Sequence, residues 1–135
     1  MAATTTLGRD TSCTTRLFAG RVVEGARLLA EAYFRRLTTE RGALLDDPDY
    51  GLAVSGLLNA GLTVSELASI PGRIRNELEK DDRGKREALR VVVRRSTTNV
   101  AAYTIAIHGE TQDGDGFDLV LSVDEVTVQI LGVAA

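Results

Sequence analysis

The sequence predicts an α+β fold in which N-terminal helices pack on one face of a mostly antiparallel C-terminal β-meander of about four strands. Apolar residues recur every three or four positions in the first half of the chain, as on an amphipathic helix, and every second position after about residue 88, as on a half-buried strand. Short, turn-rich connections between the expected strands favour antiparallel neighbours. Helices that precede a run of strands indicate an α+β arrangement of two layers.

The composition is that of a globular protein with one domain. The chain has 135 residues, of which 44% are hydrophobic and 26% charged, so we expect one α+β domain over residues 19–135. Residues 1–18 are rich in Thr and small side chains without an apolar period, which predicts a flexible arm. Because the chain has neither a secretory signal nor a long apolar segment, we expect synthesis in a cytoplasm and no membrane partner.

An amphipathic helix is predicted over residues 21–37, where the apolar positions are spaced by three or four. The segment 38–51 then breaks this period with Gly42, Pro48 and Gly51. Proline also biases the residue before it away from helical backbone angles. A shaped loop is therefore expected after the first helix.

Two further helices are predicted before the strands. A short one is expected over residues 52–58, and Thr63 and Glu66 then have the spacing of a capping box that starts the next. Pro71 lies inside the following apolar stripe, where it removes one helical hydrogen bond. We expect either a bent helix that runs to about Lys80 or two shorter helices.

Four strands are predicted from the period of two. Their apolar positions are Leu89, Val91 and Val93; Tyr103, Ile105 and Ile107; Phe117, Leu119, Leu121 and Val123; and Val126, Val128 and Ile130. The alternate positions form a polar face rich in Arg and Asp. His108 belongs to this outward set and is expected at the surface.

The charge balance and the residue counts exclude several functions. A net charge of −3 without a cluster of unbalanced basic residues argues against a nucleic-acid partner. Cys13 is the only cysteine and His108 the only histidine. These counts exclude an intramolecular disulfide, a thiolate metal cage, a multi-histidine metal site and a histidine-dependent triad. We expect no metal and no cofactor.

Acidic residues are the remaining candidates for catalysis, as in a small muralytic hydrolase that would use two of Asp46, Asp47, Asp49, Asp81 and Asp82. The substrate groove of a glycosidase is usually lined with aromatic residues, whereas this chain has no Trp, three Tyr and three Phe. Loop solvation and helix capping explain the acidic residues more simply. We therefore predict no catalytic residues.

Three features occur in a fixed order over residues 20–132. The first is a loop after the first helix, with Thr39, Gly42, Pro48, Tyr50 and Gly51. The second is a helix that ends in acidic residues followed by arginine, and the third is the strand-rich C-terminal half. In this order they resemble the baseplate-wedge family of contractile phage tails, which includes sheath-initiating subunits and a related component of type VI secretion baseplates.

The Glu-Pro-Arg motif of that family has two alignments in this chain. It matches either Asp81, Asp82 and Arg83 or the segment from Glu87 to Arg90. The resemblance implies that these residues contact neighbouring wedge subunits, with Arg83 as the charge-pairing member and Asp81 as the acidic one. Arg residues interleaved with carboxylates are typical both of a solvated face and of a polar protein interface.

The resemblance implies a non-enzymatic structural protein of the virion, assembled in the host cytoplasm into a sixfold-symmetric tail baseplate. Its implied partners are other baseplate wedge proteins and the tail sheath protein, with the tail tube or hub as a further candidate. Sheath assembly would start by strand addition at a sheet edge, for which residues 89–95 and 126–131 are candidates. A muralytic hydrolase and a strand-augmentation adaptor outside a virion remain the alternative functions.

Overall fold

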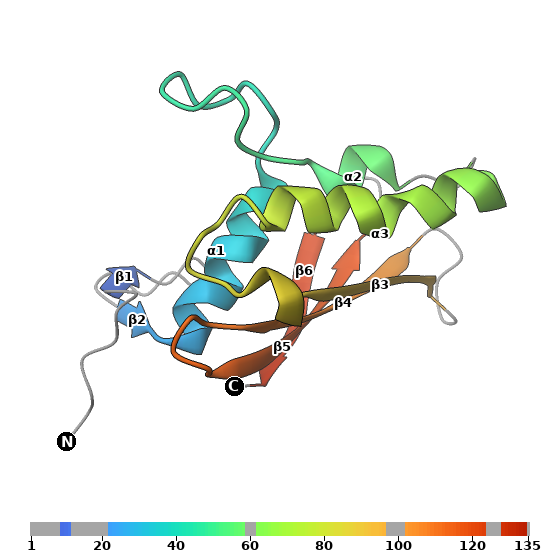
Figure 1. Ribbon diagram of the computed structural model, residues 1–135. Coiled ribbons are helices and arrows are strands. Elements are labelled where there is room, and N and C mark those ends of the chain that lie inside the picture. The colour runs from blue at the N-terminus through green and yellow to red at the C-terminus, as the bar shows by residue number, and fades with distance from the viewer. Residues whose placement is uncertain (1–8, 12–21, 59–61, 97–101, 124–127, 135) are drawn as a thin grey trace.

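The computed structural model describes residues 9–11, 22–58, 62–96, 102–123 and 128–134. The elements are β1 (Arg9–Thr11), β2 (Val22–Glu24), α1 (Ala26–Thr38), α2 (Val54–Leu57), α3 (Val64–Leu78), the 3-10 helix η1 (Arg86–Ala88), β3 (Arg90–Arg95), β4 (Tyr103–Glu110), β5 (Gly116–Val123) and β6 (Val128–Ala134). The helices α1 and α3 lie on one side of the sheet formed by β3–β6 (Figure 1). This arrangement confirms the predicted α+β class.

The main sheet is a four-stranded antiparallel meander in the order β3-β4-β5-β6. Buried and more exposed residues alternate along β4 and β5, as the period of two predicts. A register shift between Val120 and Leu121 marks an irregularity in the pairing of β5 with β6. Consecutive strands are neighbours throughout, so β3 and β6 are the two edges of this sheet.

The core lies between the helices and the inner face of the sheet. Its large buried side chains include Tyr33 from α1, Ile74 from α3, and Ile105 and Phe117 from the sheet. The rings of Tyr33 and Phe117 pack against each other with their centroids 5.6 Å apart. Each fully buried aliphatic or aromatic side chain contributes about 1.5–3 kcal/mol to folding, so this contact layer is the main source of stability.

The first helix begins at Ala26 rather than at residue 21. The residues before it, Val22–Glu24, form β2 and pair in antiparallel with β1, so backbone pairing replaces the expected first turns of helix. Apart from β1, the predicted arm over residues 1–18 lies outside the described residues, and its flexibility stays a prediction. The predicted turns at 97–100 and 124–125 also lie outside them.

The start of α3 confirms the predicted capping box. The Thr63 amide donates to Glu66 Oε2 at 2.8 Å, and the Glu66 amide donates to Thr63 Oγ1 at 3.1 Å. The helix then continues through Pro71 to Leu78 as one element, so the alternative of two shorter helices is wrong. Tertiary packing of Ile70, on one side of the proline, and Ile74, on the other, holds the helix together across the missing hydrogen bond. The short helix α2 spans Val54–Leu57, within the predicted 52–58.

Candidate functional site

A projecting loop, defined here as residues 40–50, leaves the end of α1 and rises away from the body of the protein (Figure 1). Its residues from Glu40 to Asp49 are all exposed. The loop starts where the Thr39 hydroxyl donates to the Arg35 carbonyl at 2.7 Å. It ends where the Leu52 amide returns to the Arg36 carbonyl at 2.8 Å, so both ends of the loop are tied to the last turn of α1.

The five predicted loop residues have different surroundings. Gly42 and Pro48 are exposed in the loop, whereas Thr39 and Tyr50 are half-buried at its base. The Arg36 guanidinium lies over the Tyr50 ring, 4.5 Å from its centroid. Gly51 is buried at the end of the loop, with a φ of 104°. The structure therefore brings Thr39, Tyr50 and Gly51 together and leaves Gly42 and Pro48 in solvent.

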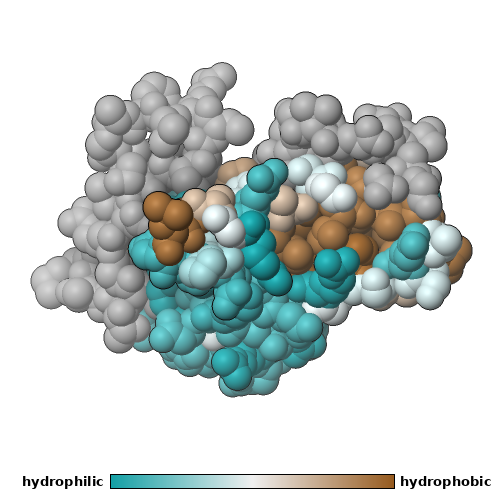
Figure 2. Space-filling model, turned by 90° about the horizontal axis from the view of Figure 1, so that it is seen from above, coloured by the Kyte–Doolittle hydropathy of each residue, from teal (hydrophilic) through white to brown (hydrophobic). Residues whose placement is uncertain are grey.

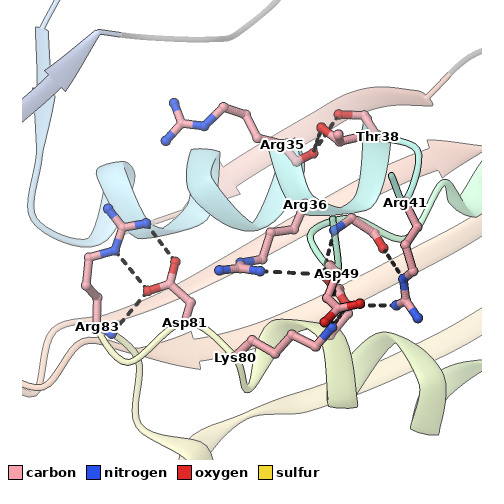
Figure 3. A network of polar contacts seen from close by, with 11 residues as sticks. Arg35, Arg36, Thr38, Arg41, Asp49, Lys80, Asp81 and Arg83 are labelled. Carbon is pink, nitrogen blue, oxygen red and sulfur yellow. Dashed lines mark hydrogen bonds and ion pairs between the residues drawn. The ribbon is translucent and has the colours of Figure 1, made fainter. Parts of the chain in front are cut away.

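Glu77 on α3 holds the base of the projecting loop. Its carboxylate, only 1% exposed, accepts the Gly51 amide at 2.8 Å. Around it, Arg41 Nη2 lies at 3.1 Å, Lys80 Nζ at 2.8 Å and Arg36 Nη1 at 3.4 Å. Figure 3 shows these three cations converging from α1, the loop and the end of α3. One carboxylate thus links three segments that are distant in the sequence.

The surroundings of Glu77 fix its charge state. Burial by itself raises the pKa of the Glu77 carboxyl. The hydrogen bonds from Lys80 and Gly51, together with the charges of Lys80 and Arg41, outweigh burial and hold that pKa below its ordinary value of 4.5. Glu77 is therefore an ionised structural anchor rather than a proton donor.

Asp81 and Arg83 form a second, separate pair within the chain (Figure 3). Arg83 Nε donates to Asp81 Oδ1 at 2.9 Å, and Arg83 Nη2 donates to Oδ2 at 2.7 Å, a bidentate geometry. The Asp81 side chain is 4% exposed and that of Arg83 is 33% exposed. Burial raises the pKa of the Asp81 carboxyl, but the hydrogen bonds and charge of Arg83 outweigh it and lower the pKa overall.

We expect the free energy of unfolding to fall in acid because of these two carboxylates. Their folded pKa values lie below the ordinary values of 4.5 for Glu77 and 3.8 for Asp81, so the unfolded chain binds protons first. Their contribution is complete above the ordinary values and is lost as the pH falls through the folded ones. Urea unfolding at a series of pH values from about 7 to about 2 would measure this loss. A Glu77→Gln variant should lose less stability in acid, and an equal loss would contradict the assignment.

The segment after α3 is pinned to the turn that follows β4. The Lys85 amide donates to the Glu110 carbonyl at 2.9 Å, and the Gln112 side chain donates to the carbonyls of Asp82 and Gly84. Buried Gly84 leaves no room for a side chain, because a Cβ there would meet the Tyr33 hydroxyl. The Asp82 backbone is thus fixed while its side chain remains exposed.

The two alignments of the acidic-arginine motif have different structural roles. Asp81 and Arg83 form an ion pair with each other, and this pair stabilises the segment after α3. Glu87 on η1 and Arg90 at the start of β3 are exposed, and neither side chain has an ion pair within the described part of the chain. The groups free to meet a partner are therefore Asp82, Glu87 and Arg90.

Strand β3 carries a basic outward row at an edge of the sheet. Arg90, Val92 and Arg94 are exposed, whereas Val91 and Val93 pack against the core. Both predicted edge strands are edges in the structure, with bounds of 90–95 and 128–134. His108 is at the surface as predicted, with 42% of its side chain exposed and its Nδ1 2.9 Å from Asp118 Oδ1.

Sequence reasoning missed the role of Glu77 and its three cations. A signal was present, because Glu77 follows Ile74 by three positions and therefore lies on the buried stripe of α3. Among the described residues, no group of His, Cys, Asp and Glu could hold a metal ion. The described helices include none that is long and apolar enough to cross a membrane.

No family model matches the chain, and no curated protein matches it. Among solved structures, a crystal structure of a Geobacter sulfurreducens protein provisionally named a tail lysozyme has the same fold, with a TM-score of 0.63. The likeness covers 80% of this chain and 100% of that one, at 20% sequence identity. A likeness at this identity shows a shared fold and leaves the function of this chain to be argued from its residues.

Proposed function

We propose that the protein is a structural subunit of a contractile-tail baseplate, which joins other wedge proteins and nucleates the tail sheath. The proposal rests on two observations. Three sequence features, namely the loop after the first helix, the acidic-arginine motif and the C-terminal strands, occur in the order of the baseplate-wedge family, and the fold is shared with a protein named for a tail. It places the chain in a virion, in multiple copies around the tail tube. The tail sheath protein, other wedge subunits and the tube or hub are its proposed partners.

The observation that carries the proposal is the position of Glu87 and Arg90 beside β3, which is an edge strand of the sheet among the described residues. An edge strand presents unpaired amides and carbonyls, and an extended segment of another chain can complete them with main-chain hydrogen bonds. Exposed charges next to that edge can fix the register of the incoming strand. In this scheme Asp81 and Arg83 shape the charged junction, residues 77–90, and the outward charges of Asp82, Glu87 and Arg90 contact the partner.

A muralytic hydrolase is the second candidate, because the protein of like fold is provisionally named a lysozyme. A glycoside hydrolase needs a carboxylic acid with a raised pKa opposite a second carboxylate. Among the described residues, the carboxyls with shifted pKa values are Glu77 and Asp81, and both pKa values are shifted downward. Asp46, Asp47 and Asp49 lie on the projecting loop, and all three are exposed to solvent. The site therefore favours the assembly role.

We predict that the double charge reversal Glu87→Lys and Arg90→Glu prevents sheath assembly while the protein stays folded. Both side chains are exposed and unpaired in the described part of the chain, so unfolding in urea should change by less than about 0.5 kcal/mol. Particles from a deletion strain complemented with the variant would be examined by electron microscopy. Asp115→Lys, in the β4–β5 turn, is the matched surface control, because that side chain is also exposed and has no ion pair in the described part of the chain; it should give sheathed tails.

The outcome of this experiment separates the three functions. Tubes or wedges without sheath support the baseplate role. Normal sheathed tails from the double reversal would remove the charged junction from the mechanism. Clearing of peptidoglycan by the purified wild-type protein, lost in an Asp47→Ala variant, would favour the hydrolase. Particles unchanged by deletion of the whole gene would favour an adaptor outside the virion.

A further inference from the structure

The tip of the projecting loop is apolar and acidic. Leu45 is 98% exposed and Leu44 is 39% exposed, and both are followed directly by Asp46 and Asp47. Single exposed leucines are normal on protein surfaces, so the tip indicates a partner only together with a surface of complementary charge. The base of the loop is fixed by Glu77, so the tip is presented on a supported stem rather than on a free chain.

A groove lined by basic and apolar residues lies along the base of the same loop. It consists of two adjoining hollows of about 250 and 390 Å³, both lined by Arg41, Leu52 and Arg73. Leu57 extends the apolar floor of one hollow, and Lys80 adds a further cation at the rim of the other. Figure 2 views the molecule from above and shows a small, isolated apolar group and a larger apolar area. A band of hydrophilic residues separates the two.

The charges of the groove favour an acidic occupant. Two carboxylates, Glu40 and Glu77, face three cations, Arg41, Arg73 and Lys80, in its lining. Glu77 is already neutralised by Arg41, Lys80 and Arg36, the last of these from α1. Arg73 is exposed, and its side chain has no ion pair or hydrogen bond within the described part of the chain. Arg73 is therefore the cation available to an incoming carboxylate.

We propose that the tip of the projecting loop, Leu44 to Asp47, docks into the Arg73 groove of a second copy of this chain. The leucines match the apolar floor, and the aspartates match the basic rim. The tip does not fill the groove of its own chain, because Leu45 is almost fully exposed and the loop rises away from the body (Figure 1). The tip and the groove are different surfaces, so the contact can be repeated from copy to copy or exchanged between two copies.

The contact should be weak between free molecules. Two leucines, one of them already partly covered, and one or two exposed ion pairs give modest affinity, which many copies fixed in an assembly would multiply. The inference concerns the isolated protein and does not depend on the proposed baseplate role. We expect sedimentation of the wild-type chain to show self-association that grows with concentration, and Leu45→Ser to weaken it about 10-fold or more. A wild-type chain that stays monomeric up to about 1 mM would overturn the proposal.

A charge exchange between two variants tests the docking partner directly. Arg73→Asp and Asp47→Lys should each associate about 10-fold more weakly than wild type, because each variant sets like charges against each other in its own contacts. In an equal mixture, the tip of either variant meets a groove of opposite charge on the other variant. Association should then return to near the wild-type level. The control mixes Arg73→Asp with the double variant Arg73→Asp and Asp115→Lys. No groove in that mixture carries the Arg73 cation, so association should stay weak.

The result of the mixture decides the proposal. Recovery in the mixture, together with weakening by each single variant and by Leu45→Ser, supports docking of the tip in the groove. A dimer as the end state indicates exchange between two copies, and larger species indicate repetition from copy to copy. A mixture no stronger than either variant alone would overturn the pairing of Asp47 with Arg73. All three positions are exposed, so loss of folding does not confuse the measurement.

Discussion

Replacing Glu77 by alanine is expected to lower the free energy of unfolding by about 3 kcal/mol, or the melting temperature by about 10 °C. The change leaves the Gly51 amide without its acceptor and the Arg36 guanidinium, whose side chain is 14% exposed, without its counter-charge. An uncompensated charge and an unsatisfied amide near the core are both costly. Urea unfolding at neutral pH measures the change, and limited proteolysis of the projecting loop reports on its release from α3.

Glu79→Ala is the matched control, because Glu79 lies on the same turn of the chain but, among the described residues, forms an ion pair only with exposed Arg75, at 2.9 Å. Its loss should change stability by about 0.5 kcal/mol or less. Glu77→Gln keeps an oxygen that can accept the Gly51 amide but removes the charge, so its cost should fall between the two. Equal stability of the Glu77 and Glu79 alanine variants would show that the cluster around Glu77 contributes nothing.

Much of the fold could be predicted because it depends on local patterns. The change of apolar period from about 3.6 to 2 separates helices from strands in the sequence. The capping box at Thr63 marks a helix start through two local hydrogen bonds. The predicted start of α1 was wrong because residues 22–24 form β2, which pairs with β1. The low apolar content of β1 gave no sign of this strand in the sequence. The sequence left open whether α3 continues through Pro71, because tertiary packing decides this and the sequence does not show it.

The candidate site was less predictable because charge pairing depends on tertiary contacts. Asp81, Asp82, Glu87 and Arg90 lie in one charged segment of the sequence, yet of these four only Asp81 is buried and ion-paired. The alternation of β3 did place Arg90 on the outward face, since strand geometry fixes the direction of alternate side chains. The four groups around the Glu77 carboxylate come from α1, from the projecting loop and the residue after it, and from the turn after α3. No sequence spacing could reveal their meeting.

The second large effect is expected at Gly51, where alanine should lower the free energy of unfolding by about 3 kcal/mol. Its φ of 104° lies in the left-handed region, which costs a residue with a Cβ about 1–2 kcal/mol. A Cβ built there would also collide with the carbonyl oxygen of Thr39, a backbone atom held by the end of α1. To relieve the collision, the chain would have to pull the Gly51 amide away from Glu77, which weakens the same anchor.

Gly42→Ala separates these two causes of instability. Gly42 lies in the same loop at a φ of 90°, but a Cβ there would have no atom within 4 Å. Alanine at Gly42 should therefore cost only the backbone strain, about 1 kcal/mol. The difference between the two variants in urea unfolding measures the close approach of Gly51 to Thr39. Equal costs at the two glycines would mean that the loop can move off α1 freely, and the tip would then lack the fixed stem on which docking to a second copy depends.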